Sequence, residues 1–93
     1  MTLGEAHYRF TPARAYRLNR CLYALKSDDA FRARYVADPA GAMRLMDLGE
    51  EDQAALLAGD RDGLVARGAH PYLVFMADLR LRMDRGTTAF EYF

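Results

Sequence analysis

Apolar residues recur along this chain at the spacing of short helices, and prolines, glycines and capping residues divide it into segments. Thr11-Pro12 combines a capping hydroxyl with a proline suited to the first helical turn. No stretch alternates as a β-strand would. The sequence therefore predicts an all-α fold, a small single domain of about five or six short helices. The stripe that follows Pro12 at helical spacing consists of Ala15, Leu18, Leu22 and Leu25, with Cys21 beside it.

Carboxylates and glycines mark the helices in the middle of the chain. Asp38 and Asp60 each stand where a helix cap is expected, and Asp38 precedes a proline. Ser27-Asp28-Asp29 offers a further cap with acids in the first turn. A further start follows Gly49, where three acidic residues favour the positive end of the helix dipole. Gly68 suits a left-handed helix end. The segment after Asp38 is predicted to be either a full helix or two turns. Apolar contacts are expected from Phe31, Tyr35, Met43, Met46, Leu56 and Leu57.

The strongest pattern begins at Pro71. Tyr72, Phe75, Met76 and Leu79 stand at i, i+3, i+4 and i+7, which predicts an amphipathic helix with this stripe toward the core. Gly86 and paired threonines end the helix, and an aromatic C-terminal tail, residues 85–93, follows. This tail is expected either to fold over its own core or to dock on a partner chain. We expect one domain over residues 1–93, with a core of about 10–84.

Composition leaves little material for catalysis. The 93 residues include one cysteine and two histidines, which excludes an internal disulfide and a multi-cysteine zinc site. Phosphate loops and nucleophile elbows are also absent. Cys21 is expected to be a buried structural thiol, and Ser27 a helix cap. His70 lies in a turn, where it is either a turn residue or a functional one, and His7 lies near the N-terminus. We predict no catalytic residue and no metal ligand.

Charge is balanced overall but divided along the chain. Residues 1–36 carry seven basic and three acidic groups, residues 37–62 two basic and seven acidic, and residues 63–93 four basic and three acidic. The acidic middle argues against a helix-turn-helix DNA-binding protein, because it would repel phosphates. No window approaches the roughly 20 apolar residues of a membrane span. We expect a cytoplasmic protein that binds neither nucleic acid nor membrane.

Several segments together resemble one known family. Residues 14–21 (RAYRLNRC), 48–60 (LGEEDQAALLAGD) and 68–73 (GAHPYL), with Phe31, Arg34 and Asp38 between them, resemble the small (alpha) subunits of protocatechuate 4,5-dioxygenase. The similarity covers roughly residues 10–80. Each motif is short, and their order and spacing carry the resemblance.

The resemblance implies an accessory role in a type II extradiol ring-cleavage dioxygenase. In that family the large (beta) subunit holds a non-haem Fe(II) through two histidines and a glutamate, and the helical small subunit packs on it and covers the active-site entrance. It implies a non-catalytic subunit without activity alone, which acts in a complex for aromatic compound catabolism on a catechol-type substrate. No cofactor is expected on this chain, and Fe(II) is expected on the large catalytic subunit. Residues implied to contact substrate or partner are His70, Tyr72, Gly68, Tyr16 and Asn19.

An alternative function stays open at this point. The same fold could serve as a stand-alone helical binding or homo-oligomerising module without a dioxygenase partner, and a homodimer is compatible with the sequence. Stable self-association, or ligand binding by the chain alone, would distinguish this alternative from the accessory subunit.

Overall fold

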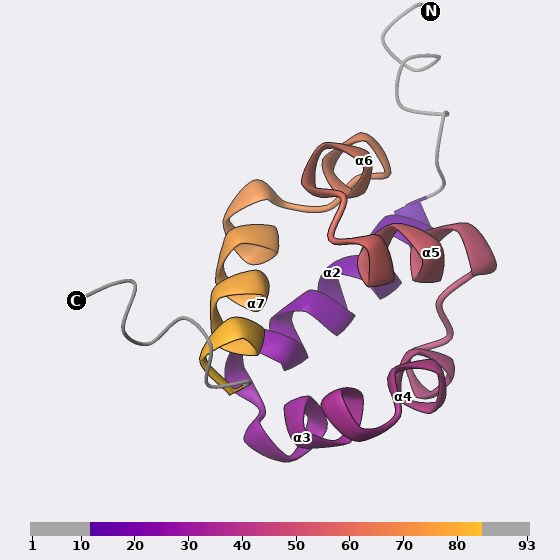
Figure 1. The fold of residues 1–93 in the computed structure, drawn as a ribbon. Helices are drawn as coiled ribbons and strands as arrows, with labels where there is room; N and C mark the ends of the chain where they lie inside the picture. Colours follow the sequence, from indigo (N-terminus) through magenta and orange to yellow (C-terminus); the bar gives the residue numbers. More distant parts are fainter. Residues whose placement is uncertain (1–11, 85–93) are drawn as a thin grey trace, which may run out of the picture.

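A computed structural model describes residues 12–84 of the chain, and within them it contains six α-helices and no strand (Figure 1). This confirms the predicted all-α fold. Thr11, His7 and the aromatic tail of residues 85–93 lie outside the described residues. The helices are α2 (Pro12–Ser27), α3 (Asp29–Ala37), α4 (Pro39–Leu45), α5 (Glu50–Ala58), α6 (Arg61–Ala66) and α7 (Pro71–Asp84).

Three aspartates cap the starts of helices, Asp38 and Asp60 as predicted; the cap expected at Ser27 is instead Asp28, because α2 continues to Ser27. The side chain of Asp28 accepts a hydrogen bond from the backbone N–H of Phe31 (3.0 Å) at the start of α3. Asp38 and Asp60 do the same at α4 and α6, each accepting from the third residue that follows. Such caps satisfy backbone donors that have no partner within the helix. The segment after Asp38 is only seven residues long, which settles its length at about two turns.

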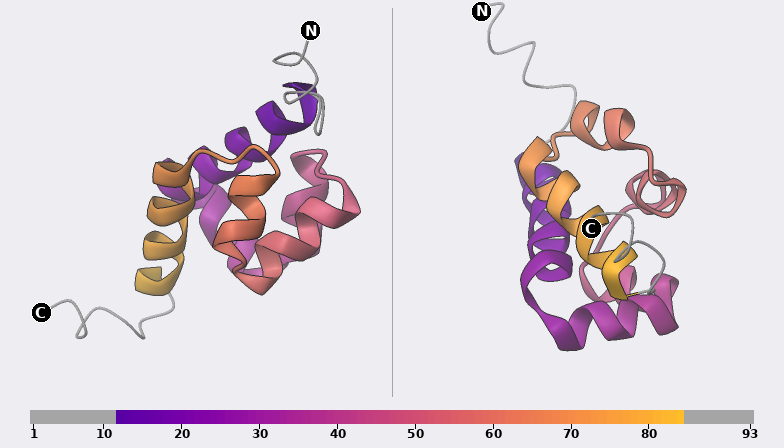
Figure 2. Two further views of the ribbon diagram at one scale, coloured as in Figure 1. Left: turned by 90° about the horizontal axis from the view of Figure 1, so that it is seen from above. Right: turned by 60° about the vertical axis from the view of Figure 1, so that its left-hand side comes forward.

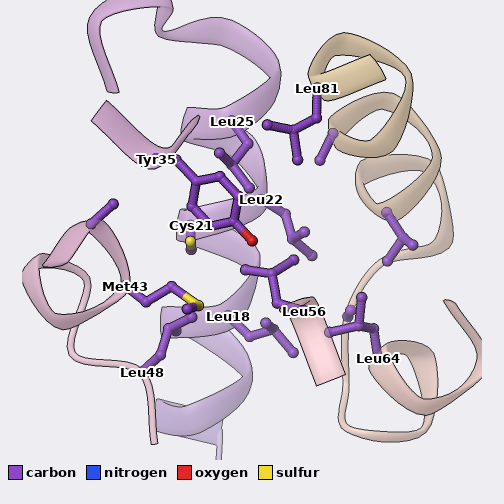
Figure 3. Packing of buried hydrophobic residues seen from close by; sticks show 14 of the residues in the cluster. Leu18, Cys21, Leu22, Leu25, Tyr35, Met43, Leu48, Leu56, Leu64 and Leu81 are labelled. Carbon is purple, nitrogen blue, oxygen red and sulfur yellow. The ribbon is translucent and has the colours of Figure 1, made fainter. Parts of the chain in front are cut away.

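The core lies along one face of α2. Leu18, Cys21, Leu22 and Leu25 are almost completely buried, as their spacing predicts. Figure 3 shows these side chains meeting residues from the surrounding helices. Cys21 is a free cysteine buried within this core, as expected of a structural thiol. The partners labelled in the figure are Tyr35, Met43, Leu48, Leu56, Leu64 and Leu81.

The predicted inner face of α7 is wrong. Tyr72 is 55% exposed and Phe75 46%, whereas Val74, Ala77 and Leu81 form the buried face. Apolar residues occur on opposite sides of this helix, so periodicity alone cannot choose between them. The small side chain of Ala77 lets α7 approach its neighbours closely. The larger side chains of Tyr72 and Phe75 are left on the surface.

Helices α3 to α7 are arranged in a ring of neighbouring helices. Each contacts the next along the chain, and α7 also contacts α3. Helix α2 packs against α7 and α3, and Figures 1 and 2 show α7 lying beside it. The loop before α7 lies beside α2, and these two segments contain four of the five predicted contact residues, Tyr16, Asn19, Gly68 and His70.

Candidate functional site

Asn19 joins the loop before α7 to α2. Its side-chain nitrogen donates to the backbone carbonyl of Gly68 (3.0 Å), and its side-chain oxygen accepts from the backbone N–H of His70 (2.7 Å). Both partners are about fifty positions away in sequence. One amide therefore satisfies a backbone acceptor and a backbone donor of the same turn. We call this place, formed by Tyr16, Asn19, Gly68, His70 and Tyr72, the α2–α7 junction.

His70 caps α7 with its ring. The Nδ1 atom accepts a hydrogen bond from the backbone N–H of Tyr72 (3.1 Å), and Pro71 occupies the first helical position. An accepting Nδ1 places the ring proton of the neutral imidazole on Nε2. The His70 side chain is exposed. It thus has a structural role in the turn and also keeps one N–H available for an external acceptor.

The other three junction residues, Gly68, Tyr16 and Tyr72, differ in backbone conformation, exposure and position. Gly68 has φ of 103°, a left-handed conformation that favours glycine, as predicted. Tyr16 is 66% exposed and lies one helical turn before Asn19. Tyr72 lies in the first turn of α7. Direct hydrogen bonds thus unite Asn19, Gly68 and His70, and the two tyrosines lie on adjacent turns.

A charged cluster beside the junction was not predicted. Asp52 is 1% exposed, and its Oδ1 lies 3.4 Å from Nη1 of Arg67, the residue before Gly68. Nη2 of the same guanidinium donates to Oε1 of Glu51 (2.9 Å). This hydrogen bond with Arg67 lowers the pKa of Glu51. The sequence indicated only that these acids begin a helix. The contact of Asp52 with Arg67 was not predicted, because it depends on how α5 packs against the loop before α7.

Two observations on residues 12–84 bear on bond chemistry: the state of the Cys21 thiol and the grouping of possible metal ligands. Burial raises the pKa of the Cys21 thiol to about 12, despite an opposing effect of Arg20, so this residue is a poor nucleophile. Between residues 12 and 84 there is no group of three or more His, Cys, Asp or Glu side chains that could hold a metal ion. The residues described therefore do not fit a two-histidine, one-carboxylate iron site.

A narrow crevice lies between α2, α5, α6 and α7. Its volume is about 30 Å³, and Leu22, Leu64 and Val74 contribute to its walls. Such a space suits about one water molecule and is too small for an aromatic ring. This crevice is therefore not a binding site for an aromatic substrate.

No helix within residues 12–84 has the length and apolar character needed to cross a membrane. The family model described as "Aromatic-ring-opening dioxygenase LigAB, LigA subunit" matches residues 18–86, well over half of the chain. Searches of curated proteins and of solved structures found no match. The family match begins within α2, so it includes Asn19, Gly68, His70 and Tyr72 and leaves out Tyr16.

Proposed function

The chain belongs to the LigA-subunit family of LigAB aromatic-ring-opening dioxygenases, and from this membership we propose its role. It is a non-catalytic small subunit that packs on the large catalytic subunit of an Fe(II)-dependent extradiol ring-cleavage dioxygenase and lids the active site. The substrate is a catechol-type aromatic compound. The observation that carries this proposal is the family match over residues 18–86.

Iron is assigned to the large subunit. Bound Fe(II) in such enzymes brings a catechol-type substrate and dioxygen together through open coordination positions. This chain would act on the reaction through binding. A lid that covers the entrance holds substrate in position and excludes water from the site.

The α2–α7 junction is the part of the chain proposed to contact substrate or the rim of the partner's active site. Nε2–H of His70 can donate a hydrogen bond, and the phenols of Tyr16 and Tyr72 can donate or accept one. Asn19 and Gly68 have a positioning role, because their hydrogen bond holds the turn that carries His70. The rigid attachment of this turn to α2 supports a role in orientation.

Reconstitution tests the function. The purified chain is mixed with the large subunit of an extradiol dioxygenase from the same organism, and ring opening of a catechol-type substrate is followed by product absorbance. We expect no activity from the chain alone and a higher rate when both are present. A large subunit that is fully active alone and never copurifies with this chain would contradict the proposal.

Two substitutions then separate the structural and functional roles of His70. His70→Asn keeps an N-cap acceptor and removes the imidazole, whereas His70→Ala removes both. We expect His70→Asn to preserve stability and to change kcat or KM of the complex, and His70→Ala to cost about 1 kcal/mol of stability as well. If His70→Asn leaves the kinetics of the complex unchanged, His70 is only a turn residue.

A further inference from the structure

The exposed aromatic residues are not scattered over the surface. Four aromatic side chains between residues 12 and 84 are largely exposed, and all four lie on α2 or α7. Isolated exposed apolar residues are normal, but a concentration of aromatics is typical of the centre of a protein interface. Tyr16, Tyr23, Tyr72 and Phe75, with Met83 also on α7, form what we call the aromatic face; elsewhere α3, α4, α5 and α6 expose Val36, Leu45, Leu57 and Val65, one each.

Contacts between α2 and α7 hold the two helices that carry this face side by side. Tyr16 precedes Asn19 by three residues and Tyr23 follows it by four, so both tyrosines share the helix side that holds the start of α7. Farther along, Nε of Arg80 donates to the backbone carbonyl of Lys26 (3.3 Å). The two helices therefore run alongside each other from Asn19 to the end of α2.

The outer side of α7 carries the rest of the face. Phe75, Leu79 and Met83 are spaced at i, i+4 and i+8, opposite the buried side formed by Val74, Ala77 and Leu81. Figures 1 and 2 show α7 at the edge of the molecule, with no other described helix on its outer side. This stripe is therefore available to a partner as far as residues 12–84 are concerned.

Charge around the aromatic face is basic. Helix α2 contains four basic residues and no acidic one. Arg17 and Arg20 pair with no carboxylate of the described helices and loops, whereas Arg82 on α7 is paired with Asp78 (3.1 Å). Helix α7 carries two acidic and two basic residues, so the net positive charge of the face comes from α2, whereas three acidic residues begin α5.

This charge distribution distinguishes between partners. A two-fold dimer through the aromatic face would bring together two copies of a surface that carries a net positive charge. A different protein with an apolar patch bordered by carboxylates would instead be complementary in both shape and charge. The structure therefore favours a heterologous partner over a second copy.

We propose that the aromatic face is the surface through which this chain docks on the catalytic subunit, and that the facing patch there is apolar with an acidic border. This inference rests on the proposed function and adds which helices form the interface. Phe75 lies on the α7 part of this face, and Arg20 lies on α2 at its basic part.

Matched charge substitutions test the face in the full chain. Phe75→Glu is compared with Leu57→Glu, because both replace an apolar side chain, 46% and 57% exposed, by an acid on different sides of the molecule. Binding to the purified catalytic subunit is measured by isothermal titration calorimetry. We expect Phe75→Glu to raise Kd by about tenfold or more and Leu57→Glu by less than about threefold.

A second pair tests the charged edge. Arg20→Glu on α2 is compared with Arg44→Glu on α4, and both positions are exposed. We expect the affinity of the unmodified chain to fall as salt rises, and Arg20→Glu to weaken binding and flatten that dependence, because screening acts on the charges it removes. Arg44→Glu should leave the affinity and its dependence on salt nearly unchanged.

The outcomes separate this inference from the proposed function. If the chain binds and activates the catalytic subunit but Leu57→Glu weakens binding more than Phe75→Glu, the docking face is wrong and the function stands. If the unmodified chain neither binds nor activates the catalytic subunit, the proposed function and the docking face both fail.

Two further results would assign the aromatic face to another occupant. A stable homodimer broken by Phe75→Glu would assign the face to a second copy. Protection of Met83 and Phe75 from hydroxyl-radical labelling in the monomeric chain would assign it to residues 85–93. Either of these last two results overturns the inference.

Discussion

Leu22 and Leu57 are the same residue type in opposite environments. Leu22 is 1% exposed on the inner face of α2, and Leu57 is 57% exposed on α5. The apolar residues in α5 gave no reason to separate Leu56 from Leu57, but only Leu56 is buried. Burial at a single position thus depends on which side of its helix faces the core. Substitution at the two leucines tests which side that is.

Leu22→Ala should lower the free energy of unfolding by about 2–5 kcal/mol, because it removes buried methyl groups and leaves a cavity. Leu57→Ala is the matched control, and its cost should be below about 0.5 kcal/mol. Urea denaturation followed by circular dichroism measures both. A loss below half a kilocalorie at Leu22 would contradict the inner face assigned to α2.

At the scale of whole elements, the attachment of α7 to α2 decides where the junction residues lie. Caps and prolines define the ends of these helices locally, but the side chain of Asn19 fixes one relative to the other through Gly68 and His70. Its two hydrogen bonds are tertiary contacts. Their loss should therefore loosen the turn before α7 more than it affects α2 itself.

Asn19→Ala should destabilise the fold by about 1–2 kcal/mol, because the partly buried carbonyl of Gly68 and the exposed N–H of His70 both lose their partner. Arg20→Ala, one position along the same helix and exposed, should cost less than about 0.5 kcal/mol. Amide hydrogen exchange adds a local measurement. The N–H of His70 should exchange faster in Asn19→Ala, and unchanged protection there would show that the turn is held by other contacts.

In the whole molecule, Arg32 ties three helices together. Its Nε donates to Oδ2 of Asp84 at the end of α7 (2.6 Å), and its Nη1 donates to the carbonyl of Leu25 near the end of α2 (2.9 Å). Nη2 pairs with Asp29 in its own helix. Burial alone would lower the pKa of Arg32, but hydrogen bonds with Asp84 and Asp29 outweigh it and the pKa is raised.

Arg32→Met should cost about 2–3 kcal/mol of stability, since the carbonyl and the carboxylates lose a charged donor that the new side chain cannot replace. Water can reach Asp84 and Asp29, which keeps the loss below that of a fully buried pair. Arg34→Met, on the exposed side of the same helix, is the control. Equal stability of the two variants would show that Arg32 does not hold the helices together.

Much of the fold could be predicted because its signals are local. Asp28, Asp38 and Asp60 act on residues three positions away, and the α2 stripe needs only helical spacing. Family resemblance singled out Asn19, Gly68 and His70 as contact residues, but the hydrogen bonds that join them were not predicted, because residues about fifty positions apart have no local signal. Asp52 and Arg32 were missed for the same reason, although Asp29 at i−3 of Arg32 was visible in the sequence.

The sequence by itself determined the helices, their caps and the buried side of α2, because hydrogen bonds within one turn and apolar spacing act over a few residues. It also carried the motifs of the family to which the chain belongs. Only the tertiary structure decided which side of α7 is buried. Both sides of that helix are apolar, and the close approach of Ala77 and Val74 to the core leaves Tyr72 and Phe75 outside. The surface proposed for docking is thus a consequence of packing.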